Sequence, residues 1–156
     1  MDVEIILIKA RLSSVYCASD ELFADLAKLD DISFPQVLKL FAVWHHWYVR
    51  RYLATQLQKE TLPPNQEELL RRQTVRHEYH SLHFDFMNKF RFYVPKEEVV
   101  MAYIERLQSN PIHYAKGVIV MKEFLRYMYS YRIFDEATTM RLSEAHEKAL
   151  CELEKL

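Results

Sequence analysis

Three histidines and three arginines lie close together in residues 67–91, EELLRRQTVRHEYHSLHFDFMNKFR. Arginine and histidine can together bind a phosphate or a carboxylate, and histidine can also transfer a proton or bind a metal ion. The six residues are Arg71, Arg72, Arg76, His77, His80 and His83. Because this stretch contains neither glycine nor proline, we expect it to form one long helix.

The spacing of polar residues predicts how this helix is turned. At 100° per residue, seven polar residues share one side, which we expect to face solvent: Glu67, Arg71, Thr74, Glu78, Ser81, Asp85 and Asn88. The opposite, apolar side is centred on Arg76, His80, His83 and Met87. Its flanks are Val75, Tyr79, Leu82 and Phe86, and on the other edge Leu70 and Phe84. We therefore expect His80 and His83 to be less than half exposed, with partners either in neighbouring helices or in a bound molecule.

Metal binding by these histidines is disfavoured by their spacing. His77, His80 and His83 spread over about 120° of the helix, so one ion cannot readily take all three. His45, on the preceding helix, could approach them in an antiparallel pair of helices. Metal sites in helix bundles, however, use inward-facing Glu-x-x-His pairs, and the chain has none. We expect neither a metal ion nor a cofactor.

Part of the same helix resembles the R-x4-H-x-Y motif of HEPN ribonucleases, which are small all-α proteins. The matching segment reads RQTVRHEY. The resemblance implies that Arg72 and His77 act on an RNA phosphodiester and that Tyr79 is a modification site. The segment departs from the family at Gln73, where the family has asparagine, and at Arg76, where it has an apolar residue. On an unbroken helix Arg72 and His77 point about 140° apart, and this function is kept as an alternative.

Composition limits the class of protein. The 156 residues carry 21 basic and 22 acidic side chains, so no global field draws the chain to nucleic acid or to a membrane. The single glycine, Gly117, nearly excludes tight hairpins and glycine-rich nucleotide loops. Cys17 and Cys151 do not have the spacing of metal ligands. The first residues lack the basic flank of a signal peptide. No apolar run reaches the length of about 18 residues that a transmembrane helix needs. These features predict a cytoplasmic protein with free thiols and no membrane contact.

Prolines and capping residues divide the chain into six or seven helices. The first is expected over residues 3–17, with a buried stripe formed by Ile5, Ile8, Leu12 and Val15, although the β-branched start VEIILI also suits a strand. Later helices are expected to be capped by Ser19, Ser33, Asn65, Asn110 and Asp135. The helix after Ser33 should run to about Lys59, and Gly117 should let two helices approach closely. The sequence therefore predicts an all-α bundle, one domain over residues 1–156, with at least about 60% helix.

Aromatic residues alternate with basic residues in three segments, 44–52, 88–93 and 124–132. Stacking rings beside a cationic groove are what binds single-stranded nucleic acid, which makes nucleic-acid binding another alternative function. Partly exposed Tyr, Trp, Arg and Met residues also form the centres of protein interfaces. Trp44 and Trp47 cannot both face one core stripe, so we expect aromatic rings at or near the surface.

The sequence as a whole favours a non-enzymatic interaction protein. We expect an adaptor, an inhibitor or a regulatory subunit that binds another protein, with a homodimer as one form of this interaction. The predicted binding residues lie on the two long helices: Trp47, Arg50, Arg51, Arg72, Arg76, His80 and His83. Arg76 supports this placement, because a permanently charged group facing an apolar sector needs an anion or a carbonyl to meet it.

Overall fold

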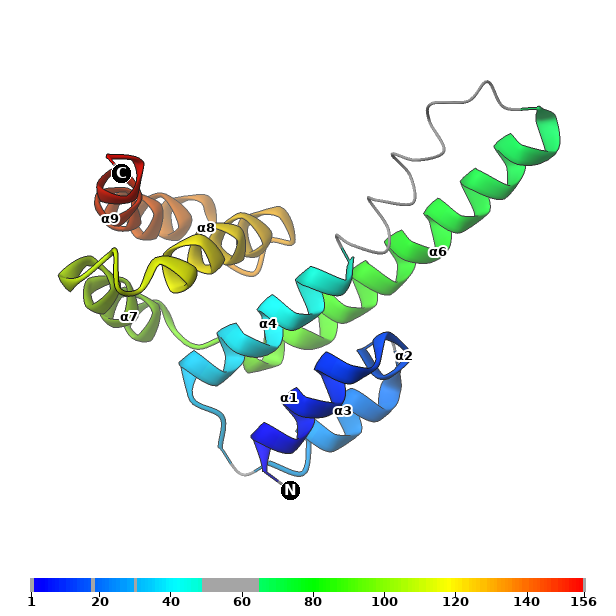
Figure 1. Cartoon of the computed structure of the whole chain (residues 1–156), viewed down its shortest axis with the longest axis horizontal. Coiled ribbons are helices and arrows are strands. Elements are labelled where there is room, and N and C mark those ends of the chain that lie inside the picture. Colours follow the sequence, from blue (N-terminus) through cyan, green and yellow to red (C-terminus); the bar gives the residue numbers. More distant parts are fainter. Residues whose placement is uncertain (1, 18, 30, 49–64, 156) are drawn as a thin grey trace. The chain divides into compact units, whose positions relative to one another are not determined.

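Helices are the regular elements of the computed structural model, which describes residues 2–17, 19–29, 31–48 and 65–155. Within 65–155, the side chains of residues 72, 74–80 and 82 lie outside the description. The described ranges contain no strand, and their helices alone exceed the expected 60% or so of the chain. Seven of these helices have seven residues or more. Figure 1 shows how the helices follow one another along the chain. The prediction of an all-α fold is confirmed.

The chain divides into two compact units. The first comprises Met1–Ile32 and Lys39–Phe90, and the second comprises Ser33–Leu38 and Arg91–Leu156. The expected single domain over residues 1–156 stays a prediction. Both units take residues from α4 (Phe34–Tyr48), whose first turn belongs to the second unit and whose remainder belongs to the first.

The first unit also contains α1 (Val3–Leu12), α2 (Ser14–Cys17), α3 (Asp20–Leu26) and the long α6 (Gln66–Phe90). In Figure 1, α1 and α3 lie side by side, and α4 lies along the C-terminal half of α6. Apolar side chains from all four of these helices form the core, and the largest fully buried ones are Phe41, Phe90, Ile6, Leu7, Leu22, Leu26 and Met87. The side of α4 that packs inward carries apolar residues at helical spacing, Val37, Leu40, Phe41 and Trp44.

The first helix buries a different face from the one expected from its sequence. Its buried residues are Val3, Ile6, Leu7 and Ala10, whereas the predicted stripe of Ile5, Ile8, Leu12 and Val15 is exposed. The VEIILI segment is helical, and the helix ends at Leu12 because Ser13 takes an extended conformation with φ −142° and ψ 116°. Both sides of this helix are apolar, and the periodicity that predicted the stripe is equally compatible with either side.

Helix starts follow the predicted capping residues in most places. The Asn65 and Asp135 side chains accept backbone hydrogen bonds at the starts of their helices, and Ser33 donates its backbone N–H to a side chain three residues later. The expected start after Asn110 is wrong, because α8 begins at Ala115. Residues 111–114 form a turn there. The expected continuation of α4 to about residue 59 lies outside the described residues.

The second unit is built mainly from α7 (Glu97–Ser109), α8 (Ala115–Ser130) and α9 (Glu136–Glu154), which follow the short helix η2 (Arg91–Tyr93). The first turn of α4 adds Phe34, whose ring meets Phe124 at a centroid distance of 5.5 Å and Tyr103 at 5.4 Å. Gly117 permits a close approach between α7 and α8, as expected. A Cβ atom at this position would lie 3.0 Å from Leu107 Cδ2.

Candidate binding surfaces

The solvent-facing side predicted for α6 is correct at its described positions. Glu67, Arg71, Ser81, Asp85 and Asn88 are exposed. His83 and Met87 are buried on the opposite side, so the expectation for His83 is confirmed. Leu70 and Phe84 were expected beside the buried sector, but they are exposed, because that sector is narrow and is centred near His83 and Phe90.

Aromatic rings surround His83 between α4 and α6. The rings of Trp44 and Phe86 stack with their centroids 4.0 Å apart. The His83 ring lies 4.8 Å from the ring of Trp44 and 4.2 Å from the ring of Tyr48. With only 3% of its surface exposed, His83 takes part in packing the two helices together.

Trp47 is the predicted binding residue that the structure places at an open surface. Its indole Nε1–H donates a hydrogen bond of 2.9 Å to the carbonyl oxygen of Ala10 in α1. The partly exposed ring lines a hollow of about 480 Å³ between α1 and α4. Arg11 and His46 provide basic groups in this hollow, whose remaining lining is Ala42 and Val43. Trp44 is buried, whereas Trp47 is partly exposed.

The other predicted binding residues fall outside what the structure describes. These are Arg50 and Arg51, together with the side chains of Arg72, Arg76 and His80. The same is true of His77, so the HEPN-like pair of Arg72 and His77 stays a prediction. Among the side chains that the structure does describe, no group of three His, Cys, Asp or Glu residues could hold a metal ion.

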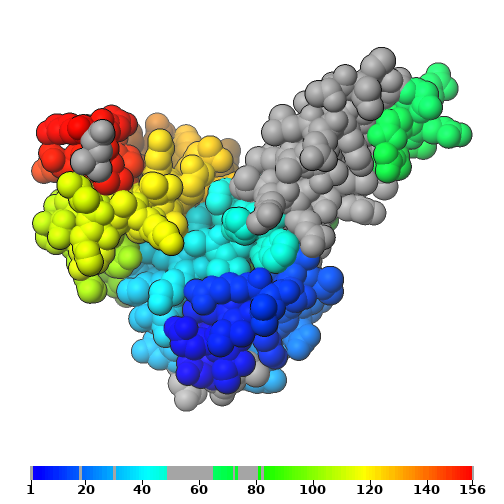
Figure 2. Space-filling view, viewed as in Figure 1, coloured from blue at the N-terminus to red at the C-terminus, as the bar shows by residue number. Residues whose placement is uncertain are grey.

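The exposed side of α1 carries residues that were expected in the core. Ile5 is 48% exposed, Ile8 53% and Leu12 80%. These residues, hereafter the α1 stripe, lie about 180° around the helix from its buried residues. Figure 2 shows α1, in dark blue, at the surface of its unit. The signal was present in the sequence as a second apolar pattern, at positions 3, 6, 7 and 10, which would leave this stripe in solvent.

A buried carboxylate of α3 contacts one flank of α1. Asp25 of α3 is 3% exposed and accepts a hydrogen bond of 2.9 Å from the hydroxyl of Tyr16. Lys9 of α1 lies 3.3 Å from the same carboxylate, and Lys28 lies 3.5 Å from it. The hydrogen bond from Tyr16, followed by the lysine contacts, holds the pKa of Asp25 below its usual value although burial opposes this. Lys9 therefore connects α1 to α3 on the flank of the helix that lies between the buried residues and the α1 stripe.

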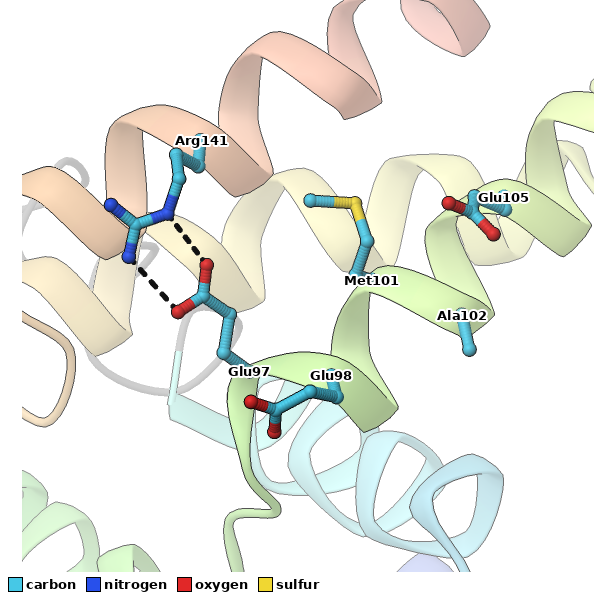
Figure 3. A pocket seen from close by; sticks show the side chains of 6 residues that line it. All are labelled: Glu97, Glu98, Met101, Ala102, Glu105 and Arg141. Carbon is cyan, nitrogen blue, oxygen red and sulfur yellow. Dashed lines mark hydrogen bonds and ion pairs between the residues drawn. The ribbon is translucent and has the colours of Figure 1, made fainter.

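A second hollow, of about 410 Å³, lies on the second unit between α7 and α9 (Figure 3). Arg141 of α9 bridges to Glu97 of α7 through two hydrogen bonds of 2.7 and 3.0 Å. These contacts lower the pKa of Glu97 and raise that of Arg141. Met101 and the exposed carboxylates of Glu98 and Glu105 complete most of the lining, so the hollow is acidic overall.

The structure and the comparisons leave the family of the chain open. Among the described residues, no helix is both long and apolar enough to cross a membrane. Searches for related sequences and folds find no matching family model, no matching curated protein and no matching solved structure.

Proposed function

We propose that the protein is a non-enzymatic protein-binding module and that α1 carries its binding surface. The observation behind this proposal is the α1 stripe, whose three large apolar side chains face solvent from one side of one helix. Single exposed leucines or isoleucines are ordinary on protein surfaces. Three of them at i, i+3 and i+7 form a continuous strip, which is the pattern by which amphipathic helices dock against other proteins.

Burial of the stripe would supply part of the free energy of a specific association. Complete burial of an isoleucine or leucine side chain contributes about 1.5–3 kcal/mol, and part of each of these side chains is already covered. Loss of translational and rotational freedom costs about 4–15 kcal/mol on association. Three partly exposed side chains can offset the lower part of that cost, so contacts beside the stripe are needed as well.

The hollow beside Trp47 supplies such contacts. Arg11 belongs both to this hollow and to the helix that bears the stripe. A partner that buries the stripe could place a carboxylate against Arg11 and an apolar group against the Trp47 ring, and tryptophan and arginine are frequent in the energetically important part of interfaces. An adaptor, an inhibitor or a regulatory subunit would use such a surface. The free thiols of Cys17 and Cys151 favour the cytoplasm as the place where it does so.

The experiment that tests this proposal compares capture of partners by three forms of the chain. The Ile8→Lys variant places a charge in the middle of the α1 stripe without weakening the helix, because lysine is a good helix former and follows Glu4 at i+4. Ile119→Lys is the matched control, since Ile119 is also a half-exposed isoleucine inside a helix, but in α8. We expect the parent chain and the control to retain the same partner and Ile8→Lys to lose it.

Two results would contradict the proposal. One is a partner that binds equally to all three forms, which would place the binding surface elsewhere. The other is co-purification of nucleic acid, visible in the A260/A280 ratio, with an affinity that falls steeply between low and moderate salt. A protein interface that depends on apolar side chains and few ion pairs should respond weakly to salt.

A further inference from the structure

We propose that the partner of the α1 stripe is a second copy of this chain, with the two α1 helices packed antiparallel about a two-fold axis near Ile8. This inference rests on the proposed function, that the stripe binds protein, and it names the partner. In a two-fold interface the same surface is used by both copies, so each half must complement itself. The charges beside the stripe have this property.

Glu4 and Arg11 carry opposite charges on the same flank of the stripe. They are seven residues apart, which places them within about 20° of each other around the helix and about 10.5 Å apart along its axis. Antiparallel packing about a two-fold axis brings equal flanks together and reverses their order along the axis. Glu4 of each copy then lies opposite Arg11 of the other, which makes two ion pairs.

These two charges are available for such pairs. Neither Glu4 nor Arg11 takes part in an ion pair within the part of the chain that the structure describes. The opposite flank is different, because Lys9 there is already held by Asp25 at 3.3 Å and lies 3.8 Å from Glu21. The free charges of α1 therefore favour antiparallel pairing, because a parallel two-fold pair would bring opposite flanks together and separate Glu4 from Arg11.

The apolar side chains fit the same arrangement. A two-fold axis near Ile8 places the two Ile8 side chains against each other. It also places Ile5 of each copy beside Leu12 of the other. Both copies would bury their stripe in one contact between two helices. An interface of this kind is at the small end of specific interfaces, so we expect a weak dimer with a dissociation constant in the high micromolar range.

Sedimentation velocity over a concentration series, from about 1 μM to about 1 mM, measures this dimer directly. The parent chain and Ile119→Lys should shift from monomer to dimer with the same dissociation constant. Ile8→Lys should remain monomeric, since two like charges would meet at the axis. Melting temperatures of all three forms show whether the helix is intact in each.

A charge exchange tests the antiparallel direction. Glu4→Arg and Arg11→Glu should each weaken the dimer about fivefold or more at low salt, because each removes two ion pairs and creates two like-charge contacts. The double variant Glu4→Arg/Arg11→Glu should return to within about threefold of the parent, since the exchanged charges meet again across the axis. A partner other than a second copy would not restore binding in this way.

Disulfide trapping locates the axis. In a Cys151→Ser background, which removes the exposed native thiol, Ile8→Cys should form an intermolecular disulfide rapidly in oxidised glutathione. Ile119→Cys in the same background is the control and should form it slowly. Equal trapping rates would overturn the placement of the axis.

The outcomes separate the two proposals. A parent chain that stays monomeric over the whole range, a dimer that survives Ile8→Lys, or a double exchange that does not recover would each overturn the second-copy inference. The parent chain could instead be monomeric and capture a different protein. If that capture is lost in Ile8→Lys and kept in Ile119→Lys, the proposed function stands without this inference. If neither association occurs, both proposals are wrong.

Discussion

Replacing His146 with leucine should remove part of the pH dependence of stability. His146 lies in α9 and is 1% exposed. Its Nε2–H donates a hydrogen bond of 2.7 Å to the carbonyl oxygen of Val118 in α8, and none of the described residues forms a hydrogen bond with the buried Nδ1 atom. Burial lowers the pKa of His146 below its usual value, although the bond to Val118 and the nearby Glu147 act in the opposite direction. The neutral ring is therefore the form that the fold accommodates.

The sign and size of the effect follow from this lowered pKa. Below about pH 6.5 the unfolded chain protonates this histidine while the folded chain does not, so acid favours unfolding. The contribution to stability is complete above about pH 6.5 and is lost as the pH falls toward the folded-state pKa. The loss proceeds at up to about 1.4 kcal/mol per pH unit. Between pH 7.5 and 5.5 we therefore expect His146 to account for up to about 1.4 kcal/mol of lost stability.

Urea denaturation at a series of pH values, followed by circular dichroism, measures this difference. His146→Leu should be about 0.5–1.5 kcal/mol less stable at neutral pH, because one hydrogen bond is lost. It should then lose less stability than the parent on acidification. His113→Gln, which removes an exposed histidine of the same unit, is the matched control. If the parent and His146→Leu lose equal free energy from pH 7.5 to 5.5, the buried ring is not the titrating group and the reasoning fails.

Three further predictions concern packing, thiol reactivity and a single hydrogen bond. Gly117→Ala should lower the free energy of unfolding by about 1 kcal/mol in urea denaturation, because crowding of the new Cβ against the buried Leu107 outweighs the gain in helix propensity. A more stable variant would show that the Leu107 side chain can move aside. Of the two cysteines, only the exposed Cys151 should react rapidly with a thiol reagent in the native protein, because burial raises the pKa of Cys17 to about 11. Rapid reaction of both thiols would contradict this prediction. Trp47→Phe, which removes the hydrogen bond to α1, should cost about 1 kcal/mol in urea denaturation, and an unchanged midpoint would show that this bond contributes nothing.

The local elements of this protein could be predicted from its sequence, because their causes lie within a few residues of each other. Asn65 and Asp135 start helices through hydrogen bonds to backbone groups three residues later. The solvent-facing side of α6 is recognisable because its polar residues recur at helical spacing over many turns. The close approach at Gly117 was predictable as well, since the chain has one glycine and that glycine lies on an apolar face.

The rotation of α1 could not be predicted in this way. This helix has one apolar side at Val3, Ile6, Leu7 and Ala10 and another at Ile5, Ile8 and Leu12, so periodicity alone allows either to be buried. The choice depends on contacts with residues that are distant in the sequence. Lys9 reaches Asp25, and the Ala10 carbonyl accepts the hydrogen bond from Trp47.

The same limit applies to the candidate binding surface. The sequence placed binding on the two long helices and correctly expected Trp47 near the surface, but it assigned the α1 stripe to the core. Whether an apolar side chain of such a helix belongs to the core or to an interface is decided by which side of the helix packs against the rest of the fold. That information resides in the tertiary structure, because burial depends on the positions of several helices at once, whereas the tendency to form each helix depends mainly on its own residues.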